Sequence, residues 1–463
     1  AARLTAAIFL LVLMICNLMF ISVGTGKFAE EFLPLPRWEA TLIVLAVVGI
    51  YVTLGGFFGV ILTDIFQTLL IGAGAVIMGV MVFAKPAATT FIHKDPGWFS
   101  LAPTWHLWSG FAAETPPAYQ HFGLFGPLMA AGFFWMIFRI LAGPNVWDFQ
   151  FFLTTRSPRD AQLAAGMWTV GYNLRWVLAV CFMILGIFYL GGTQAGFDAE
   201  KIMPLVLLKM PVGLRGLFMA VLLAALMSTI SAMINVTSSV VINDFVKRYI
   251  AKDLSQKKLV RLGQIASVVA VLIGFVFSLS FTNIVTAWEM MVFVVVTVIL
   301  VPATLRWHYW RFGAKAFVWS MGVSAVLISL RLVFVKGLHA SASLALDVGL
   351  SLATTLVIAA LTKPADMEVL VKFYAKVRPF GFWGPVRREC VKRGLVPAKD
   401  NMPKIDILNG FITAAFQFSL AILPFYLFMR NWKHLGIWSA AAAAIAVVLY
   451  FTWYKNLPRK DEL

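Results

Sequence analysis

Two groups of side chains inside long apolar runs have the chemistry to hold a cation. Residues 224–239 are mostly small and hydroxyl-bearing, with Ser228 and Thr229 in the middle of an apolar run. Hydroxyls and backbone carbonyls supply oxygens suited to a hard cation such as sodium. Hydroxyls that bond back to the preceding helical turn are the alternative. Asp64 lies in a second apolar run, after a Gly55–Gly56 pair that is predicted to break the helix. It either receives or releases a cation or complements a helix N-terminus.

A third group follows a Gly143–Pro144 pair that should interrupt a helix inside another apolar run. Unwound backbone at membrane depth persists only where it lines a cavity or is buried in protein, and such breaks mark solute sites in membrane carriers. A simple proline kink is the alternative. The candidate substrate-binding residues after the break are Asn145, Trp147, Asp148 and Gln150.

Two arginines, Arg139 and Arg175, also lie inside apolar runs. Ionisable residues there are costly, so each should pair with a carboxylate such as Asp148 or Asp64, or bind an anionic substrate. Structural pairing is the favoured interpretation. Arg331 and Glu289 lie nearer the ends of runs and receive no role.

The elements that position these residues are predicted to be membrane-spanning helices. The chain has 463 residues, of which 61% are hydrophobic and 13% charged, about half the charged fraction of a soluble domain. Apolar runs of roughly 20 residues suffice to cross a bilayer. The predicted fold is therefore all-α and integral to the membrane, with about twelve spans: 4–26, 38–54, 59–83, 126–154, 163–191, 213–243, 260–281, 284–305, 315–335, 342–361, 408–428 and 435–454.

The loops between these spans alternate in charge. The basic loops all fall on one side, which the positive-inside rule makes the cytoplasm. The net charge of +17 then reflects loops that meet anionic lipid rather than nucleic acid. The loop 363–405 is a cytoplasmic basic segment of unassigned role. Span parity places the C-terminus in the cytoplasm, so its match to an ER-retention signal is coincidental, and the expected location is the plasma membrane.

Three motifs occur in order along the chain: residues 53–67, 150–161 and 216–244. Together they resemble the sodium/solute symporter family, which includes carriers of sugars, proline and pantothenate. The resemblance extends from about residue 4 to residue 460. It implies an inverted-repeat helix bundle of the leucine-transporter type that forms a single transporter domain over 1–463. Residues 4–361 would hold core helices three to ten and two further spans, and residues 408–454 two C-terminal spans.

The resemblance also implies roles for individual residues. Ala225 would offer its backbone carbonyl to Na⁺, and Ser228 and Thr229 their hydroxyls. Asp64 matches an acidic residue on the cation's path near the inner face, and Asn145 falls beside the substrate. The implied activity is Na⁺-coupled symport of a small polar solute by alternating access, without an organic cofactor.

The chain departs from the family in ways that bear on the solute. Phe151 follows Gln150 where many members have arginine, and Val146 stands where sugar carriers tend to have glutamine. These differences weaken an assignment to sugar and leave sugars, amino acids and carboxylates open. The first span resembles the third helix of the family's core, so we expect the first core helices to be missing and this chain alone not to accumulate solute.

Three other functions remain as alternatives. A proton-coupled carrier would use the same fold, but Ser228 and Thr229 without a nearby carboxylate favour Na⁺. A transporter-like sensor would need a soluble domain after the last span. An intramembrane enzyme would need a nucleophile and base or a metal site, whereas the six histidines lie outside or at the edges of the spans. We expect a carrier and not an enzyme.

Overall fold

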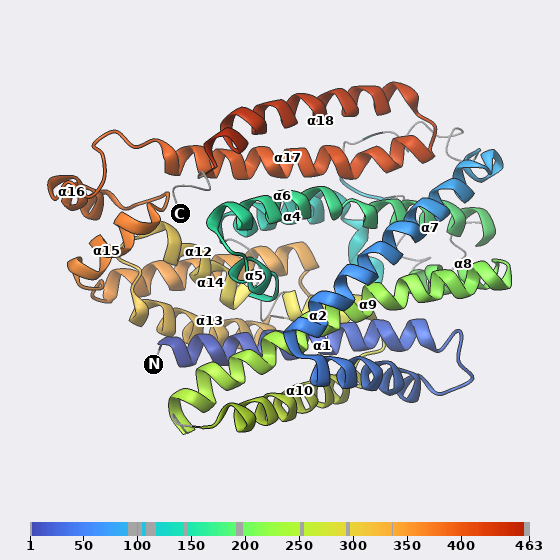
Figure 1. The fold of residues 1–463 in the computed structure, drawn as a ribbon, viewed down its shortest axis with the longest axis horizontal. Helices are drawn as coiled ribbons and strands as arrows, with labels where there is room; N and C mark the ends of the chain where they lie inside the picture. Colours follow the sequence, from blue (N-terminus) through green and yellow to red (C-terminus); the bar gives the residue numbers. More distant parts are fainter. Residues whose placement is uncertain are drawn as a thin grey trace. The chain divides into compact units, whose positions relative to one another are not determined.

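The computed structural model describes residues 2–90, 100, 104–107, 117–142, 146–190, 198–250, 254–292, 297–335 and 337–457, with 2, 117, 118, 121 and 146–148 described by backbone only. The described chain is helical throughout (Figure 1). Its α-helices are α1 (Ala2–Ala29), α2 (Arg37–Phe83), α4 (Phe125–Ala142), α5 (Val146–Leu153), α6 (Pro158–Gly171), α7 (Leu174–Leu190), α8 (Ile202–Leu208), α9 (Val212–Val240), α10 (Gln256–Ser278), α11 (Ile284–Met290), α12 (Thr297–His308), α13 (Ala314–Phe334), α14 (Ala340–Leu361), α15 (Met367–Val377), α16 (Gly384–Lys392), α17 (Met402–Phe428) and α18 (Trp432–Thr452). A π-helical turn, Val241–Ile250, continues α9.

Ten helical segments within the described residues are long and apolar enough to cross a membrane. The predicted number was about twelve. The difference has two sources: α2 is one 47-residue element that contains two predicted spans, and the predicted span 284–305 is described as α11 and α12, with residues 293–296 outside the description. The all-α membrane prediction is confirmed.

The two halves of α2 meet at Gly56, whose φ of 56° and ψ of −156° are not helical. Glycine adopts this backbone geometry without steric cost, so the predicted break at Gly55–Gly56 is confirmed. Asp64 lies two helical turns beyond the break. The helix dipole acts mainly on the first turn, so Asp64 is not explained as a helix-terminal acid.

The predicted span 163–191 is two helices rather than one. After α6 ends at Gly171, the Asn173 side-chain amide donates to the carbonyl oxygens of Thr169 (2.8 Å) and Val170 (3.2 Å). This side-chain bonding closes the end of α6 before α7 begins. The short helix α8 was not predicted.

The Cα positions divide the chain into two compact units. The unit that contains the candidate cation residues comprises 14–123, 146–287 and 413–463. In it, α2 packs against α7, α9 and α10. At the α2–α9 crossing, a Cβ on Gly74 would lie 2.7 Å from the buried side chain of Val221. Glycine at this position therefore lets the two helices approach closely.

The other unit comprises 1–13, 124–145 and 288–412. Here α12, α13 and α14 pack on one another and α4 contacts α12 and α14. The segment 363–405 folds as α15 and α16, which bury a core of their own that includes Tyr374, Trp383 and Cys390. The basic segment is thus an ordered helical pair rather than a plain loop.

A buried ionic cluster joins the end of α1 to the short segment 198–201. Lys27 Nζ lies 2.8 Å from Asp198 Oδ2 and 2.6 Å from Glu200 Oε2, and it donates to Asn283 Oδ1 at 3.2 Å. Glu200 also accepts the backbone N–H groups of Ile284 and the residue after it, each at 2.9 Å. The lysine is 5% exposed, so the cluster fixes the start of α11 against α1.

A second buried ion pair lies between α13 and α14. Arg331 donates to both carboxylate oxygens of Asp347, with an Nε–Oδ1 distance of 2.8 Å, and to Ser343 Oγ at 3.1 Å. Asp347 is fully buried. Arg331 lies in the last turn of α13, near the end of a span as predicted. The sequence assigns it no role, whereas in the structure its guanidinium neutralises a carboxylate that apolar surroundings would not tolerate alone.

We predict that the Lys27 cluster makes the folded protein less stable at acidic pH. Burial opposes ionisation of Glu200, but the backbone N–H of Ile284 and the Lys27 ammonium outweigh it and lower the pKa of Glu200 below its ordinary value of 4.5. The unfolded state therefore binds more protons, so the stabilisation is complete above about pH 4.5 and is lost as pH falls through the lower folded pKa. The melting temperature of purified protein should fall over this window, and Glu200→Gln should flatten the dependence. Equal slopes in the two proteins would contradict it.

We also predict that Arg331 and Asp347 are strongly coupled. Asp347→Leu alone should cost about 3–5 kcal/mol, because it leaves a buried guanidinium without a counter-charge. The double variant Arg331→Met/Asp347→Leu should regain most of that loss. Denaturant or thermal unfolding in detergent checks both, and a double variant no more stable than Asp347→Leu would show that the pair is not coupled.

Candidate functional site

The hydroxyl run of α9 contains two kinds of hydrogen bond. Thr229 Oγ1 donates to the carbonyl of Ala225 at 3.1 Å, and Ser231 and Thr237 likewise bond to carbonyls of the preceding turn. Ser228 is different: its Oγ donates to Asp64 Oδ1 on α2 at 2.7 Å. The back-bonding interpretation thus describes Thr229, Ser231 and Thr237. It does not describe Ser228, or Ser238, whose Oγ donates to the carbonyl of Gly263 on α10 at 2.9 Å.

The contact between Ser228 and Asp64 corrects one prediction. The sequence shows no carboxylate close to Ser228 and Thr229 along the chain, and on that ground it favours Na⁺ over H⁺. The packing of α2 on α9 brings Asp64 to Ser228 across 164 positions of the chain. Both side chains are half-buried, so the pair is shielded from water without being sealed from it.

Further polar groups surround this pair on α2. Tyr51 Oη donates to the carbonyl of Met227 on α9 at 3.3 Å. Gln67, one turn after Asp64, is 6% exposed, and its Oε1 has no hydrogen-bond partner among the described residues. A buried amide oxygen without a donor is rare and calls for a ligand or water. The α2–α9 interface therefore offers a carboxylate, a hydroxyl and an unused amide oxygen.

The substrate candidates are only partly described. Asn145 lies outside the described residues, as does the Gly143–Pro144 pair, so the predicted break is not tested there. Trp147 and Asp148 belong to α5, with their side chains outside the description. Gln150, also on α5, accepts from Asn235 Nδ2 at 2.9 Å and donates to the carbonyl of Ala232 at 3.4 Å.

Ser228, Ala232 and Asn235 occupy one face of α9, because they are four and three residues apart. Asp64 bonds to the first of them and Gln150 to the other two. Seven residues of α-helix rise about 10 Å. The structure thus places the candidate cation residue on α2 and one candidate substrate residue on α5 along a single polar stripe of α9.

Several ionisable groups were missed or misjudged from sequence. Arg175, predicted to pair with a carboxylate, lies over the ring of Tyr172 with its guanidinium carbon 4.5 Å from the centroid. Asp347 and the Lys27–Glu200 pair were not singled out. Asp347 carries the same signal as Asp64, a carboxylate in an apolar run, and that rule applied throughout would have found it.

Comparisons with known proteins agree with this architecture. The model of the sodium:solute symporter family matches residues 1–95 and 163–321, more than half of the chain. A sodium/glucose cotransporter from Vibrio parahaemolyticus is 25% identical over 284 residues, which is 56% of this chain and 50% of that protein. A sodium/sialic acid symporter from Proteus mirabilis is 26% identical over 230 residues, covering 48% of this chain and 44% of its own length.

A sodium/mannose cotransporter from Bos taurus is 26% identical over 51% of this chain and 42% of its own length. The chain thus spans about half or less of each of these relatives. A solved structure of a Na⁺-coupled sialic acid symporter in a substrate-bound, outward-open state superposes with a TM-score of 0.60 at 19% identity, over 79% of this chain and 75% of that one. The chain shares its fold, the leucine-transporter-type bundle. This multi-pass membrane protein belongs to the sodium:solute symporter family.

Proposed function

We propose that this chain acts in sodium-coupled symport of a small polar solute across the plasma membrane by alternating access. The match to the sodium:solute symporter family over residues 1–95 and 163–321 carries the proposal. The bond from Ser228 on α9 to Asp64 on α2 bears on where the ion passes. It sets a carboxylate beside the residues that the family resemblance makes Na⁺ ligands. Family membership supports the coupling ion and the membrane setting.

In the proposed ion site, Ala225 contributes its backbone carbonyl and Ser228 and Thr229 their hydroxyls. A hydroxyl oxygen can donate its proton and still offer lone pairs. Because Ser228 donates its proton to Asp64, the lone pairs of the serine oxygen face away from the carboxylate. A cation can bind to the serine oxygen from that side. Thr229 Oγ1 donates to the Ala225 carbonyl in this structure, and that carbonyl also accepts the helical N–H of Thr229. In the proposed site the Thr229 hydroxyl turns to the ion and frees one lone pair of the carbonyl. Asp64 is the next anionic group on the path of the cation.

In the proposed solute site, Asn145, Trp147, Asp148 and Gln150 bind the solute beside α9. The bond between Gln150 and Asn235 ties this group to the helix that holds the ion. Motion of α9 on ion binding would therefore change the position of α5. The solute is a sugar, an amino acid or a carboxylate, and the names of the relatives put sugars and sialic acid first in any panel.

The energetics of such coupling are simple. An inward potential of 100 mV contributes about 2.3 kcal/mol for each Na⁺, which corresponds to roughly fifty-fold accumulation of solute. The C-terminus faces the cytoplasm in this proposal, and the basic segment 363–405 lies at the inner membrane surface.

We predict that Ser228→Ala raises the Na⁺ concentration for half-maximal uptake about tenfold, the effect of losing roughly 1.4 kcal/mol of ion binding. Asp64→Asn keeps the shape of the side chain but removes its charge, and it should slow Na⁺-driven uptake. The assay is accumulation of sugars, sialic acid, amino acids and carboxylates in vesicles that contain the product of the intact reading frame, with and without an inward Na⁺ gradient.

Thr237→Val is the matched control, because Thr237 lies on the same helix, is 2% exposed and bonds to its own backbone at 2.7 Å. It should leave the Na⁺ dependence within about twofold of the unmodified protein. The proposal would be refuted if uptake of every solute were independent of the Na⁺ gradient and the folded protein bound no ²²Na⁺.

Proton coupling is the second candidate, and the carboxylate beside Ser228 is the observation that favours it. Asp64 would then carry a proton between the two sides of the membrane. In that case a pH gradient without Na⁺ would drive accumulation, and Asp64→Asn would abolish it while Ser228→Ala would have a smaller effect. Sodium coupling predicts the reverse dependence on the two gradients.

A further inference from the structure

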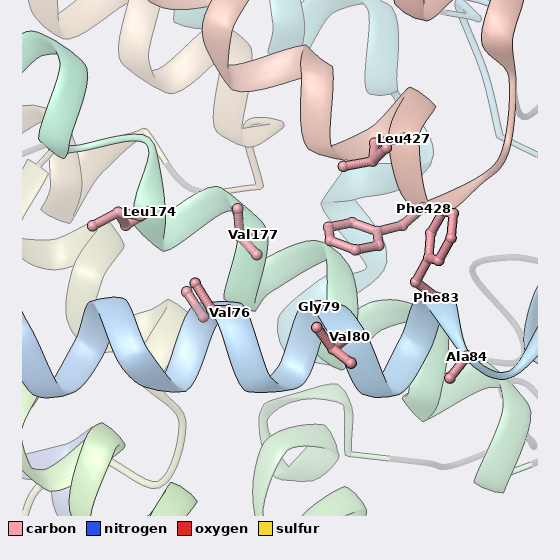
Figure 2. Close-up of a pocket in the computed structure, with 10 residues that line it drawn as sticks. Val76, Gly79, Val80, Phe83, Ala84, Leu174, Val177, Leu427 and Phe428 are labelled. Atoms are coloured by element: carbon pink, nitrogen blue, oxygen red, sulfur yellow. The ribbon is translucent and has the colours of Figure 1, made fainter.

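A groove outside the proposed transport site runs along α2 in the unit that contains α7 and the second half of α17. Its volume is about 390 Å³. Every side chain that lines it is apolar, and Figure 2 shows the two phenylalanine rings at one end and Leu174 at the other. The lining residues are Ala75, Val76, Gly79, Val80, Phe83, Ala84, Leu174, Val177, Leu427 and Phe428.

Small residues on α2 keep this groove open. A Cβ on Gly79 would lie 2.9 Å from Cζ of Phe428, so a larger residue here would push the α17 ring away. Val76 and Val80 are 63% and 64% exposed, although both belong to a helix apolar enough to span a membrane. An exposed apolar face on such a helix suits acyl chains better than water, and an apolar hollow in that face has the chemistry to hold one chain.

Two cations lie at the phenylalanine end of the groove. Arg430 donates to the carbonyl of Phe83 at 2.5 Å, and its guanidinium carbon lies 5.1 Å from the centroid of that ring. Lys85, two residues after Phe83, donates to Tyr189 Oη at 2.7 Å. Neither cation forms a salt bridge within the described part of the chain, and each keeps N–H groups free of the bonds named here.

Aromatic residues indicate that the phenylalanine end of the groove lies at the membrane interface. The ring of Trp432, 57% exposed, lies 6.3 Å from that of Phe83, and Tyr189 receives the bond from Lys85. Trp and Tyr concentrate where the bilayer meets water, as do lysine and arginine. The groove therefore starts at headgroup depth between cations and continues into the hydrocarbon along α2.

We propose that this groove binds one anionic phospholipid, with an acyl chain against α2 and the phosphate between Arg430 and Lys85. An acyl chain gains little by leaving bulk lipid for an apolar groove, because both surroundings are equally apolar. Preference for one phospholipid over another must therefore come from the end of the groove that holds Arg430 and Lys85. Each cation near the headgroup should favour an anionic lipid about five-fold, so the two together distinguish it from a zwitterionic lipid about 25-fold.

The test is native mass spectrometry of the detergent-purified chain, titrated with phosphatidylglycerol or phosphatidylcholine of the same acyl chains. Phosphatidylglycerol should bind about 25-fold more tightly, and the double variant Lys85→Gln/Arg430→Gln should remove that preference. Glycerol phosphate, which has the headgroup chemistry without acyl chains, should not bind. Its binding equal to that of the lipid would identify a free-phosphate site and overturn the proposal.

Two further variants separate the groove from general surface charge. Val80→Trp fills the groove from an exposed position and should weaken both lipids while the protein stays monodisperse. Lys209→Gln removes an exposed lysine that does not line the groove and should leave the preference unchanged. Equal affinity for the two lipids in the unmodified protein would refute the phospholipid site. A preference that the double variant leaves unchanged, or lipid affinities that Val80→Trp leaves unchanged, would also refute it.

Discussion

The low dielectric of the bilayer is the constraint on which the rest of this structure depends. A carboxylate, guanidinium or ammonium that enters it must be paired or bonded within the protein. Lys27, Arg331 and Asp347 obey this rule with opposite charges. Asp64 obeys it with a neutral hydroxyl, that of Ser228. Unlike Asp347, Asp64 is bonded to a neutral group, so in the proposed ion path a mobile cation can act as its counter-charge.

The same constraint distinguishes hydroxyls that bond to their own helix from the Ser228 hydroxyl, which bonds to a carboxylate on α2. Within the described helices, most serine and threonine hydroxyls satisfy themselves on the carbonyl of the preceding turn, as Ser22, Thr25 and Thr355 do. Such bonds are a local way to satisfy a hydroxyl inside a helix and carry no information about function. Ser228 leaves that pattern because α2 brings a better acceptor within reach. The direction of a hydroxyl's hydrogen bond is therefore a sharper indicator of a site than its presence in a span.

The Asp64–Ser228 contact and the apolar groove along α2 have a common origin in close helix contact. Gly74 lets α2 approach α9, and Gly79 lets it approach the end of α17. The first contact brings Asp64 to Ser228, and the second leaves an apolar hollow below Arg430. One helix with small residues on successive turns thus supports both the proposed ion path and the proposed lipid site.

Composition and periodicity by themselves determined that this chain is an all-α membrane protein and where most of its spans begin and end, because the bilayer imposes length and polarity on each helix independently. They also identified the hydroxyl run of α9, Asp64 and the break at Gly56. Only the tertiary structure decided which of these groups meet. The Asp64–Ser228, Gln150–Asn235, Lys27–Glu200 and Arg331–Asp347 contacts join different helices. Hydropathy reports how deep a residue lies but not the rotation of its helix or the identity of its neighbour, so these pairs follow from packing alone.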